Sequence, residues 1–249
     1  MAERSKFDTV ADRYATGRPD YPSALFDALA QILRRPLAGA DAVDLGAGTG
    51  ISSRQLAARG ARVTAVELSR PMVLRLAADS PGVRPVQGSA HAIPLLDACA
   101  DLVTCAQAWH WIDPALGVPE VIRVLRPGGV FGAWWNHTLR DLPWERAQAA
   151  RLDAAVGPWI RDYNVPEHFQ TDYGLVPESR KFAWQRTLAV DVHLENLASK
   201  SYVAELPDPD AFLAAERAAL LRVFPDGLVV ERFTTELITV RTAGGPTAA

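Results

Sequence analysis

The stretch Val43-Asp44-Leu45-Gly46-Ala47-Gly48-Thr49-Gly50 decides the fold of this chain. It joins a short apolar run, typical of a buried strand, to three glycines at alternate positions and then to a helical pattern over 51–59. A strand, a tight glycine turn and a helix N-terminus are therefore expected in direct succession. Because glycine has no Cβ, a ligand can lie directly against the backbone of such a turn.

Apolar runs and amphipathic segments alternate along the rest of the chain. Strands are expected over 40–45, 62–67, 83–87, 101–106, 130–135, 182–190 and 228–242. Helices are expected over 23–34, 51–59, 70–78, 114–124, 194–205 and 210–224. This alternation indicates βαβ units. We therefore predict an α/β, Rossmann-like fold: a mostly parallel seven-stranded sheet with helices on both faces. Ligands of such sheets bind at the carboxyl ends of the strands.

The alternation stops after Trp135, where 136–181 predicts a small helical cap inserted after the fifth strand. The aromatic side chains of this segment, together with Trp135, either line a cap over an apolar or planar ligand or form the ordinary core of the cap. They are Trp144, Trp159, Tyr163, Phe169 and Tyr173. We predict one domain over 1–249. Its other parts are an N-terminal segment and helix (1–35), a ligand-binding core (36–135) and C-terminal helices and strands (182–242).

Composition narrows the class of partner. The 249 residues carry 26 basic and 29 acidic side chains, a formal net charge of −3, without the basic excess of a nucleic-acid footprint. No apolar stretch approaches the length of a membrane span, and no apolar signal region follows Met1. Cys99 and Cys105 lack metal-ligand spacing. We expect a cytoplasmic monomer or homodimer that binds small molecules, without nucleic acid, membrane or metal.

Two ligand classes compete for the glycine turn. The dinucleotide fingerprint is G-x-G-x-x-G, but here the spacing is G-x-G-x-G and Ile51 stands where the third dinucleotide glycine would be. Glu67 ends the second expected strand, where it holds a ribose of either ligand or lies ahead of the next helix. Asp44 would repel a pyrophosphate and suits a cation. S-adenosylmethionine (SAM), a sulfonium without phosphate, is therefore favoured, and an NAD(P)-dependent oxidoreductase remains the alternative.

Further segments carry a resemblance over residues 7–135. They are FDTVADRY (7–14) with GRPDYP (17–22), QGSAHAIPL (87–95), AQAWHWID (106–113) and LRPGG (125–129). Together with 43–50, these segments resemble the class I SAM-dependent methyltransferases. More narrowly, they are similar to the small-molecule branch that includes trans-aconitate-type and ubiquinone-biosynthesis-type enzymes.

The resemblance implies a methyltransferase that uses SAM, releases S-adenosylhomocysteine (SAH) and methylates an O, N or C atom of a small organic acceptor. A SAM-binding protein without turnover is a further alternative. Many relatives carry Asp where Ser89 stands, and a hydroxyl supplies a weaker hydrogen bond to adenine. The resemblance implies that Gly46, Ala47, Gly48 and Gly50 contact the methionine part of SAM beside Asp44, and that Ala106 with Gln107 lies at its ammonium. It implies that Glu67 holds the ribose, that Leu68 and Met72 lie around the adenine, and that Ser89 and Ala90 lie at the adenine edge. Tyr14 and Arg18 would close over the site, with Arg18 bound to the carboxylate.

Methyl transfer is an in-line displacement at a sulfonium carbon, so alignment supplies much of the catalysis. A base is needed only if the acceptor must lose a proton. His110 follows the fourth expected strand and is the first candidate base; otherwise it is a structural histidine between Trp109 and Trp111. His137, after the fifth strand, is the second candidate, and Tyr14 is the candidate for orienting the acceptor.

Overall fold

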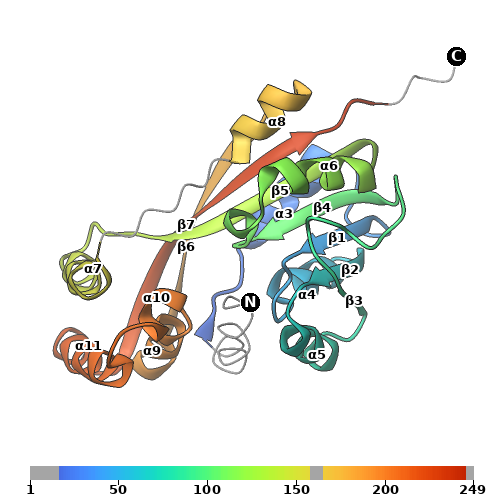
Figure 1. The fold of residues 1–249 in the computed structure, drawn as a ribbon. Coiled ribbons are helices and arrows are strands. Elements are labelled where there is room, and N and C mark those ends of the chain that lie inside the picture. The colour runs from blue at the N-terminus through green and yellow to red at the C-terminus, as the bar shows by residue number, and fades with distance from the viewer. Residues whose placement is uncertain (1–16, 158–164, 245–249) are drawn as a thin grey trace, which may run out of the picture. The chain divides into compact units, whose positions relative to one another are not determined.

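The computed structural model describes residues 17–157 and 165–244. Seven strands form one sheet in the order β3-β2-β1-β4-β5-β7-β6 (Figure 1). The strands are β1 (Asp41–Leu45), β2 (Arg62–Glu67), β3 (Val83–Gln87), β4 (Ala100–Ala106), β5 (Leu125–Thr138), β6 (Glu178–Ala189) and β7 (Leu228–Arg241). The predicted seven-stranded α/β sheet is confirmed.

The strands from β3 to β5 are parallel, and the next strand in the sheet, β7, runs in the opposite direction. The pairs β1–β2, β1–β4, β2–β3 and β4–β5 are all parallel. Beside β5, however, the N–H of Thr242 donates to the carbonyl of Gly129 (2.9 Å) and the N–H of Leu139 donates to that of Arg232 (3.2 Å). Residue numbers therefore rise along β5 as they fall along β7, so these two strands are antiparallel. The sheet is mixed but mostly parallel, as predicted.

The helices begin at identifiable signals. They are α3 (Ser23–Leu33), α4 (Ile51–Ala57), α5 (Arg70–Asp79), α6 (Pro114–Val124), α7 (Pro143–Val156), α8 (Val165–Tyr173), α9 (Val190–Ala198), α10 (Ser201–Ala204) and α11 (Pro209–Val223), with a 3₁₀ turn, η1, at Trp109–Trp111. The carboxylate of Asp113 caps α6 by accepting the N–H of Ala115 at 3.0 Å. The helix expected over 194–205 is instead two helices, α9 and α10. Between them, the hydroxyl of Ser199 donates to the carbonyl of Asn196 (2.7 Å).

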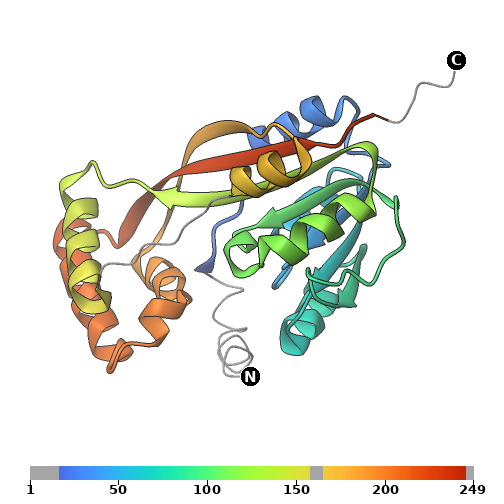
Figure 2. The same cartoon turned by 45° about the horizontal axis from the view of Figure 1, so that its top comes forward.

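The described chain divides into two compact units. Unit 1 comprises 17–19, 137–157 and 183–234, and unit 2 comprises 20–136, 165–182 and 235–244. Unit 1 therefore contains α7, α9, α10 and α11, whereas α8 belongs to unit 2 (Figures 1 and 2). The helices that follow β5 are thus shared between the two units.

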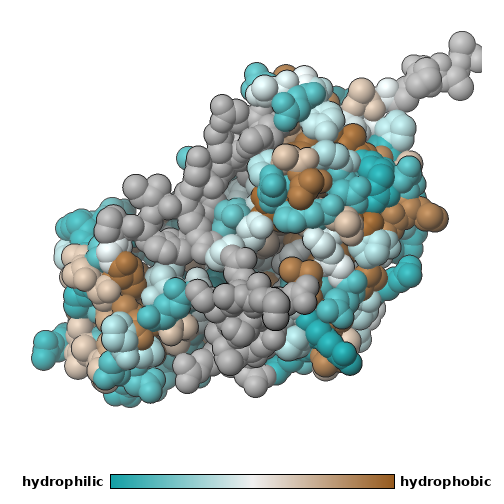
Figure 3. All heavy atoms as spheres, in the orientation of Figure 1, coloured by the Kyte–Doolittle hydropathy of each residue, from teal (hydrophilic) through white to brown (hydrophobic). Residues whose placement is uncertain are grey.

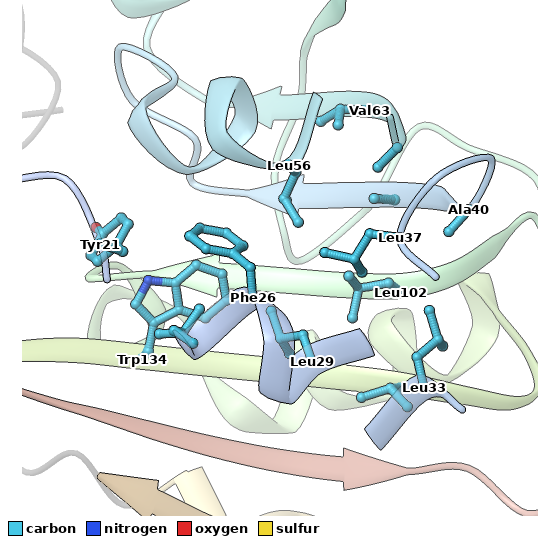
Figure 4. Close-up of a cluster of buried hydrophobic side chains, with 14 of the residues drawn as sticks. Tyr21, Phe26, Leu29, Leu33, Leu37, Ala40, Leu56, Val63, Leu102 and Trp134 are labelled. Atoms are coloured by element: carbon cyan, nitrogen blue, oxygen red, sulfur yellow. The ribbon is translucent and has the colours of Figure 1, made fainter. Parts of the chain in front are cut away.

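Unit 2 holds two apolar clusters, one on each face of its strands. Neighbouring residues of β4 belong to different clusters: Leu102 packs with residues of α3, α4 and α5, and Val103 packs with residues of α6 and α8. In the first cluster, Trp134 lies edge-on to Tyr21, with ring centroids 5.5 Å apart, and edge-on to Phe26, 6.1 Å away (Figure 4). Each fully buried large apolar side chain stabilises the fold by roughly 1.5–3 kcal/mol. The two helix layers thereby fix the strand ends that carry the site.

Unit 1 combines a small apolar core with a buried polar chain. Arg186 donates to Glu231 (2.6 Å), whose other oxygen lies 2.7 Å from Nδ1 of His193. The Nε2 atom of His193 is 2.9 Å from the side-chain nitrogen of Gln148, which donates to Glu216 (3.2 Å). Both glutamates are almost fully buried. This chain of hydrogen bonds connects β6, β7, α9, α7 and α11.

Hydrophilic residues alternate with hydrophobic ones on the coloured part of the face drawn in Figure 3. Within residues 17–157 and 165–244, the helices are all too short or too polar to cross a membrane.

Candidate functional site

The glycine turn lies at the carboxyl end of β1, against the loop that follows β4. Gly46, Gly48 and Gly50 all have positive φ values, of 61°, 57° and 86°. A Cβ on Gly46 would lie 2.7 Å from the Cβ of Ala108. Glycine at position 46 is therefore required both by the left-handed backbone and by the close approach of the neighbouring loop.

Backbone N–H groups of the turn are already bonded within the protein. The N–H groups of Gly46 and Ala47 donate to the carbonyl of Val66, at 2.9 and 3.3 Å. The N–H of Gly48 donates to the carboxylate of Glu67 at 2.8 Å. A dinucleotide-binding turn instead directs its N–H groups at a pyrophosphate. This turn is therefore arranged for a ligand that places no phosphate on it.

Glu67 is held at the end of β2 by two backbone groups. One carboxylate oxygen accepts the N–H of Gly48, and the other accepts the N–H of Ser69 at 2.8 Å. Burial raises the pKa of Glu67 above its ordinary value, although these two bonds oppose the rise. Each carboxylate oxygen has a second lone pair. Glu67 can therefore fix the glycine turn and still accept two hydroxyl groups from a ligand.

Asp44 lies beneath the turn and has no exposed surface. Its two oxygens accept hydrogen bonds from the hydroxyls of Ser53 (2.6 Å) and Thr104 (2.7 Å), on α4 and β4. Burial raises the pKa of Asp44 to about 6, against the lowering effect of these hydroxyls. Its charge would thus act on a ligand at the turn through space, not by contact.

Of the residues predicted around an adenine, Leu68 directly follows β2, Met72 lies in α5, and Ser89 and Ala90 follow β3. Leu68 is 51% exposed and can pack against a flat ring, whereas Met72 is buried. Ser89 and Ala90 are half-buried. The hydroxyl oxygen of Ser89 accepts the N–H of His91 at 3.1 Å. Ser89 therefore meets a ligand most readily as a donor.

A strained residue stands at the end of β4. Gln107 has a φ of 57° although it is not glycine, and its N–H donates to the carbonyl of Trp134 at 2.8 Å. Such outliers cluster at ligand sites because the surrounding structure must hold them in place. Ala106 and Gln107 are half-buried; Ala106 ends β4, the strand next to β1, and Gln107 follows it. The turn after β1 and the turn after β4 therefore face the same edge of the sheet.

The residues present fit SAM. The hydroxyl of Thr49, inside the glycine turn, is buried without a hydrogen-bond partner among the described residues. A carboxylate or amino group of a ligand can satisfy it. Two carboxylates, Asp44 and Glu67, give the turn a negative field, which suits a sulfonium and an ammonium and disfavours a phosphate.

The two candidate histidines lie at the ends of different strands. His110 is half-buried in η1, where its Nδ1 atom accepts the indole N–H of Trp135 at 3.2 Å. Its ring lies 5.0 Å from that of Trp111, whereas Trp109 is buried in the core. The expected packing between the two tryptophans therefore involves Trp111. His137, near the end of β5, is half-buried in unit 1.

The predicted N-terminal contributors are described only in part. Tyr14 lies outside the described residues. Arg18 belongs to unit 1, where its guanidinium donates to the hydroxyl of Ser199 (2.8 Å) and to the same residue's carbonyl (3.1 Å). The proposed contact of Arg18 with a ligand carboxylate stays a prediction.

The aromatic side chains expected in a cap are found in several environments. Trp135 and Phe169 are buried in the core of unit 2. Trp144 packs edge-on against Phe224 within unit 1, with centroids 5.2 Å apart. Tyr173 is 42% exposed, and Trp159 and Tyr163 lie outside the described residues. Ordinary core packing therefore accounts for Trp135 and Phe169.

Sequence reasoning missed three features of this site. The hydroxyls of Ser53 and Thr104 donate hydrogen bonds to both oxygens of the buried Asp44 carboxylate, and the only signal for Thr104 is a polar residue inside an apolar strand. The left-handed backbone of Gln107 and the bond from Trp135 to His110 leave no signal in the local pattern, because both depend on how neighbouring strands pair.

Comparison with known proteins agrees with this geometry. A family model for a methyltransferase domain matches residues 43–133. An uncharacterized methyltransferase of Mycobacterium tuberculosis is 37% identical over 202 residues, 81% of this chain and 79% of the relative. A demethylmenaquinone methyltransferase of Clavibacter sepedonicus is 41% identical over 99 residues, 38% of this chain and 40% of the relative.

Among solved structures, a candidate type II methyltransferase from Anaeromyxobacter dehalogenans superposes with a TM-score of 0.70 and 26% identity, over 91% of this chain and 97% of that one. The similarity thus extends well beyond the glycine turn. The alignment with the mycobacterial relative covers about four-fifths of each protein. The chain therefore belongs to the class I SAM-dependent methyltransferases, whose methyl donor is SAM and whose product is SAH.

Proposed function

We propose that this protein transfers the methyl group of SAM to an O, N or C atom of a small organic acceptor. The observation that carries the proposal is the carboxylate of Glu67, which accepts the N–H of Gly48 at 2.8 Å and so joins the ribose position to the glycine turn. The bonded N–H groups of that turn and the family assignment together exclude the NAD(P)-dependent alternative.

The residues proposed to hold the donor, most of them in unit 2, would act as follows. SAM supplies an electrophilic methyl carbon on a sulfonium that leaves as neutral SAH. Glu67 would accept the two ribose hydroxyls with its remaining lone pairs. The backbone of Gly46, Ala47, Gly48 and Gly50 would contact the methionine part above Asp44, and Ala106 and Gln107 would lie at the ammonium. Leu68 and Met72 would pack against the adenine, and Ser89 and Ala90 would lie at its edge. Tyr14 and Arg18 are the remaining residues proposed to contact the donor.

The chain's own contribution to the chemistry is alignment. A fixed strand-end site converts a bimolecular displacement into one between held partners, which supplies a large part of the rate. His110, His137 and Tyr14 are the residues proposed to face the acceptor. A base is required only where the acceptor arrives with a proton on its attacking atom.

A small acceptor is favoured over a nucleic acid. The net charge of −3 provides no phosphate-binding excess. Relatives named for their acceptors include the demethylmenaquinone methyltransferase and a malonyl-[acyl-carrier protein] O-methyltransferase of Pectobacterium atrosepticum, 32% identical over 138 residues. The proposal includes a monomer or homodimer in the cytoplasm, without nucleic-acid, membrane or metal partners.

A SAM-consumption screen tests this function. Small acids, phenols and quinol-like compounds are incubated with the full chain and SAM, and both SAH and the mass of the product are read. The expected result is a compound that gains one methyl group, with the product lost in Glu67→Ala. SAM binding with no turnover of any compound would favour a SAM-binding protein without activity, and no SAM binding at all would overturn the site.

A further inference from the structure

His110 is held by a partner that can only donate. Trp135, on β5, directs its indole N–H at Nδ1 of His110 across 3.2 Å. The Trp135 side chain is 2% exposed, so the surrounding core fixes the direction of that N–H. An indole nitrogen donates a hydrogen bond and never accepts one. The Nδ1 atom of His110 must therefore present its lone pair to Trp135.

This bond determines where the ring proton lies. A neutral imidazole has one protonated nitrogen and one lone pair, and the protonated nitrogen is set by the bond that the other makes. With the Nδ1 lone pair taken by Trp135, the proton lies on Nε2. An imidazolium would place a second hydrogen between Nδ1 and the indole and would break the bond. The Nε2 atom of His110 therefore donates a hydrogen bond to any polar group that binds it.

We infer that Trp135 is a positioning residue that fixes His110 as a hydrogen-bond donor to the methyl acceptor, so that His110 is not the general base. This inference rests on the proposed function, which places His110 beside the acceptor. It assigns His110 a different role from the general base for which the sequence made it the first candidate. The acceptors that fit are those whose attacking atom carries no proton at neutral pH and which offer an oxygen or nitrogen to the Nε2–H group.

The transfer step balances without a change at His110. A lone pair of the acceptor forms the new bond to the methyl carbon, while the carbon–sulfur bond breaks and its electron pair stays on sulfur. No proton enters or leaves the imidazole. The Nε2–H group holds the acceptor in line and takes part through its hydrogen bond alone.

The protonated nitrogen can be read directly by NMR. The full chain is labelled with ¹⁵N-histidine, and a long-range ¹H–¹⁵N correlation spectrum is recorded at pH 7.5. His110→Gln identifies the resonances of His110 among those of the five histidines. The expected pattern is protonated Nε2 and hydrogen-bonded Nδ1. In Trp135→Phe the Nδ1 resonance should shift and the second tautomer should appear.

Trp134→Phe is the matched control, because Trp134 is the neighbouring buried tryptophan in the opposite apolar cluster and packs against Tyr21. It should leave the His110 pattern unchanged. An Nδ1-protonated or doubly protonated ring in the wild-type protein, or no change in Trp135→Phe, would overturn the inference.

Turnover gives an independent reading with any acceptor that the screen identifies. Gln at position 110 keeps an N–H donor but cannot serve as a base. His110→Gln should therefore retain kcat/KM to within about tenfold, whereas removal of a true base lowers it about 10²–10⁴-fold. SAH binding is measured on the same samples. Failure to bind SAH would count against the proposed function and leave the tautomer result standing.

Discussion

The buried carboxylate of Asp44 makes a quantitative prediction about stability and pH. Burial raises its pKa from 3.8 to about 6 in the folded protein. Between these values the folded state binds a proton that the unfolded state has lost, so this group's contribution to the free energy of unfolding falls as pH rises. The total fall is about 3 kcal/mol, of which roughly half develops between pH 5 and pH 7.5. Below the unfolded pKa the contribution is fully present.

Asp44→Asn removes the titration and keeps the side-chain shape. We expect the stability of the variant relative to the wild type to rise by roughly 1–2 kcal/mol from pH 5 to pH 7.5. Urea denaturation followed by tryptophan fluorescence measures this difference at each pH. Asp41→Asn, on the same strand, is the control: the hydrogen bond from Arg62 lowers the pKa of Asp41, so its difference should stay flat over this range. A difference that is constant for Asp44→Asn, or that falls with rising pH, would refute the reasoning.

Three further substitutions test local features by equilibrium unfolding. Gly46→Ala should destabilise the fold by at least about 2 kcal/mol through backbone strain and the close contact with Ala108. The control is Gly174→Ala, which should cost less because Gly174 has a similar φ of 63° but open space around its Cβ position. Equal losses in the two variants would show that the contact with Ala108 does not contribute. Gln107→Gly should leave stability unchanged or raise it by up to about 1 kcal/mol, and a clear loss would show that Gln107 is not strained. Glu231→Gln should destabilise unit 1 by about 3 kcal/mol because it removes the buried negative charge that pairs with Arg186. Glu236→Gln, at a more exposed carboxylate on the same strand, should change stability by less than about 1 kcal/mol.

The sequence predicted the bounds of those helices and strands whose signals lie in or next to the element itself. The bounds of β2, β3 and α6 agree with the expected ranges because apolar periodicity and the Asp113–Pro114 start signal both lie within the segment itself. The glycine turn was likewise readable, since positive φ values at alternate positions require glycine.

The rest of the structure depends on distant partners. The β5 strand extends to Thr138 because β7 pairs with it from about a hundred residues further along the chain. Local periodicity contains no trace of that pairing. The same limit applies within the site: Asp44 was expected to face a cationic ligand, and its burial follows from hydroxyls on α4 and β4 that are brought to it only by the fold.

The most direct test of the account is the affinity of SAH for the wild-type chain and for Glu67→Ala, measured by calorimetric titration. Glu67 accepts the N–H of Gly48 and is proposed to hold the ribose, so its removal should weaken binding by about 1.5–3 kcal/mol, a rise in Kd of roughly 10- to 150-fold. Glu236→Ala, which removes a carboxylate of β7, should bind SAH as the wild type does. An unchanged Kd in Glu67→Ala would contradict the claim that this carboxylate joins the glycine turn to the methyl donor.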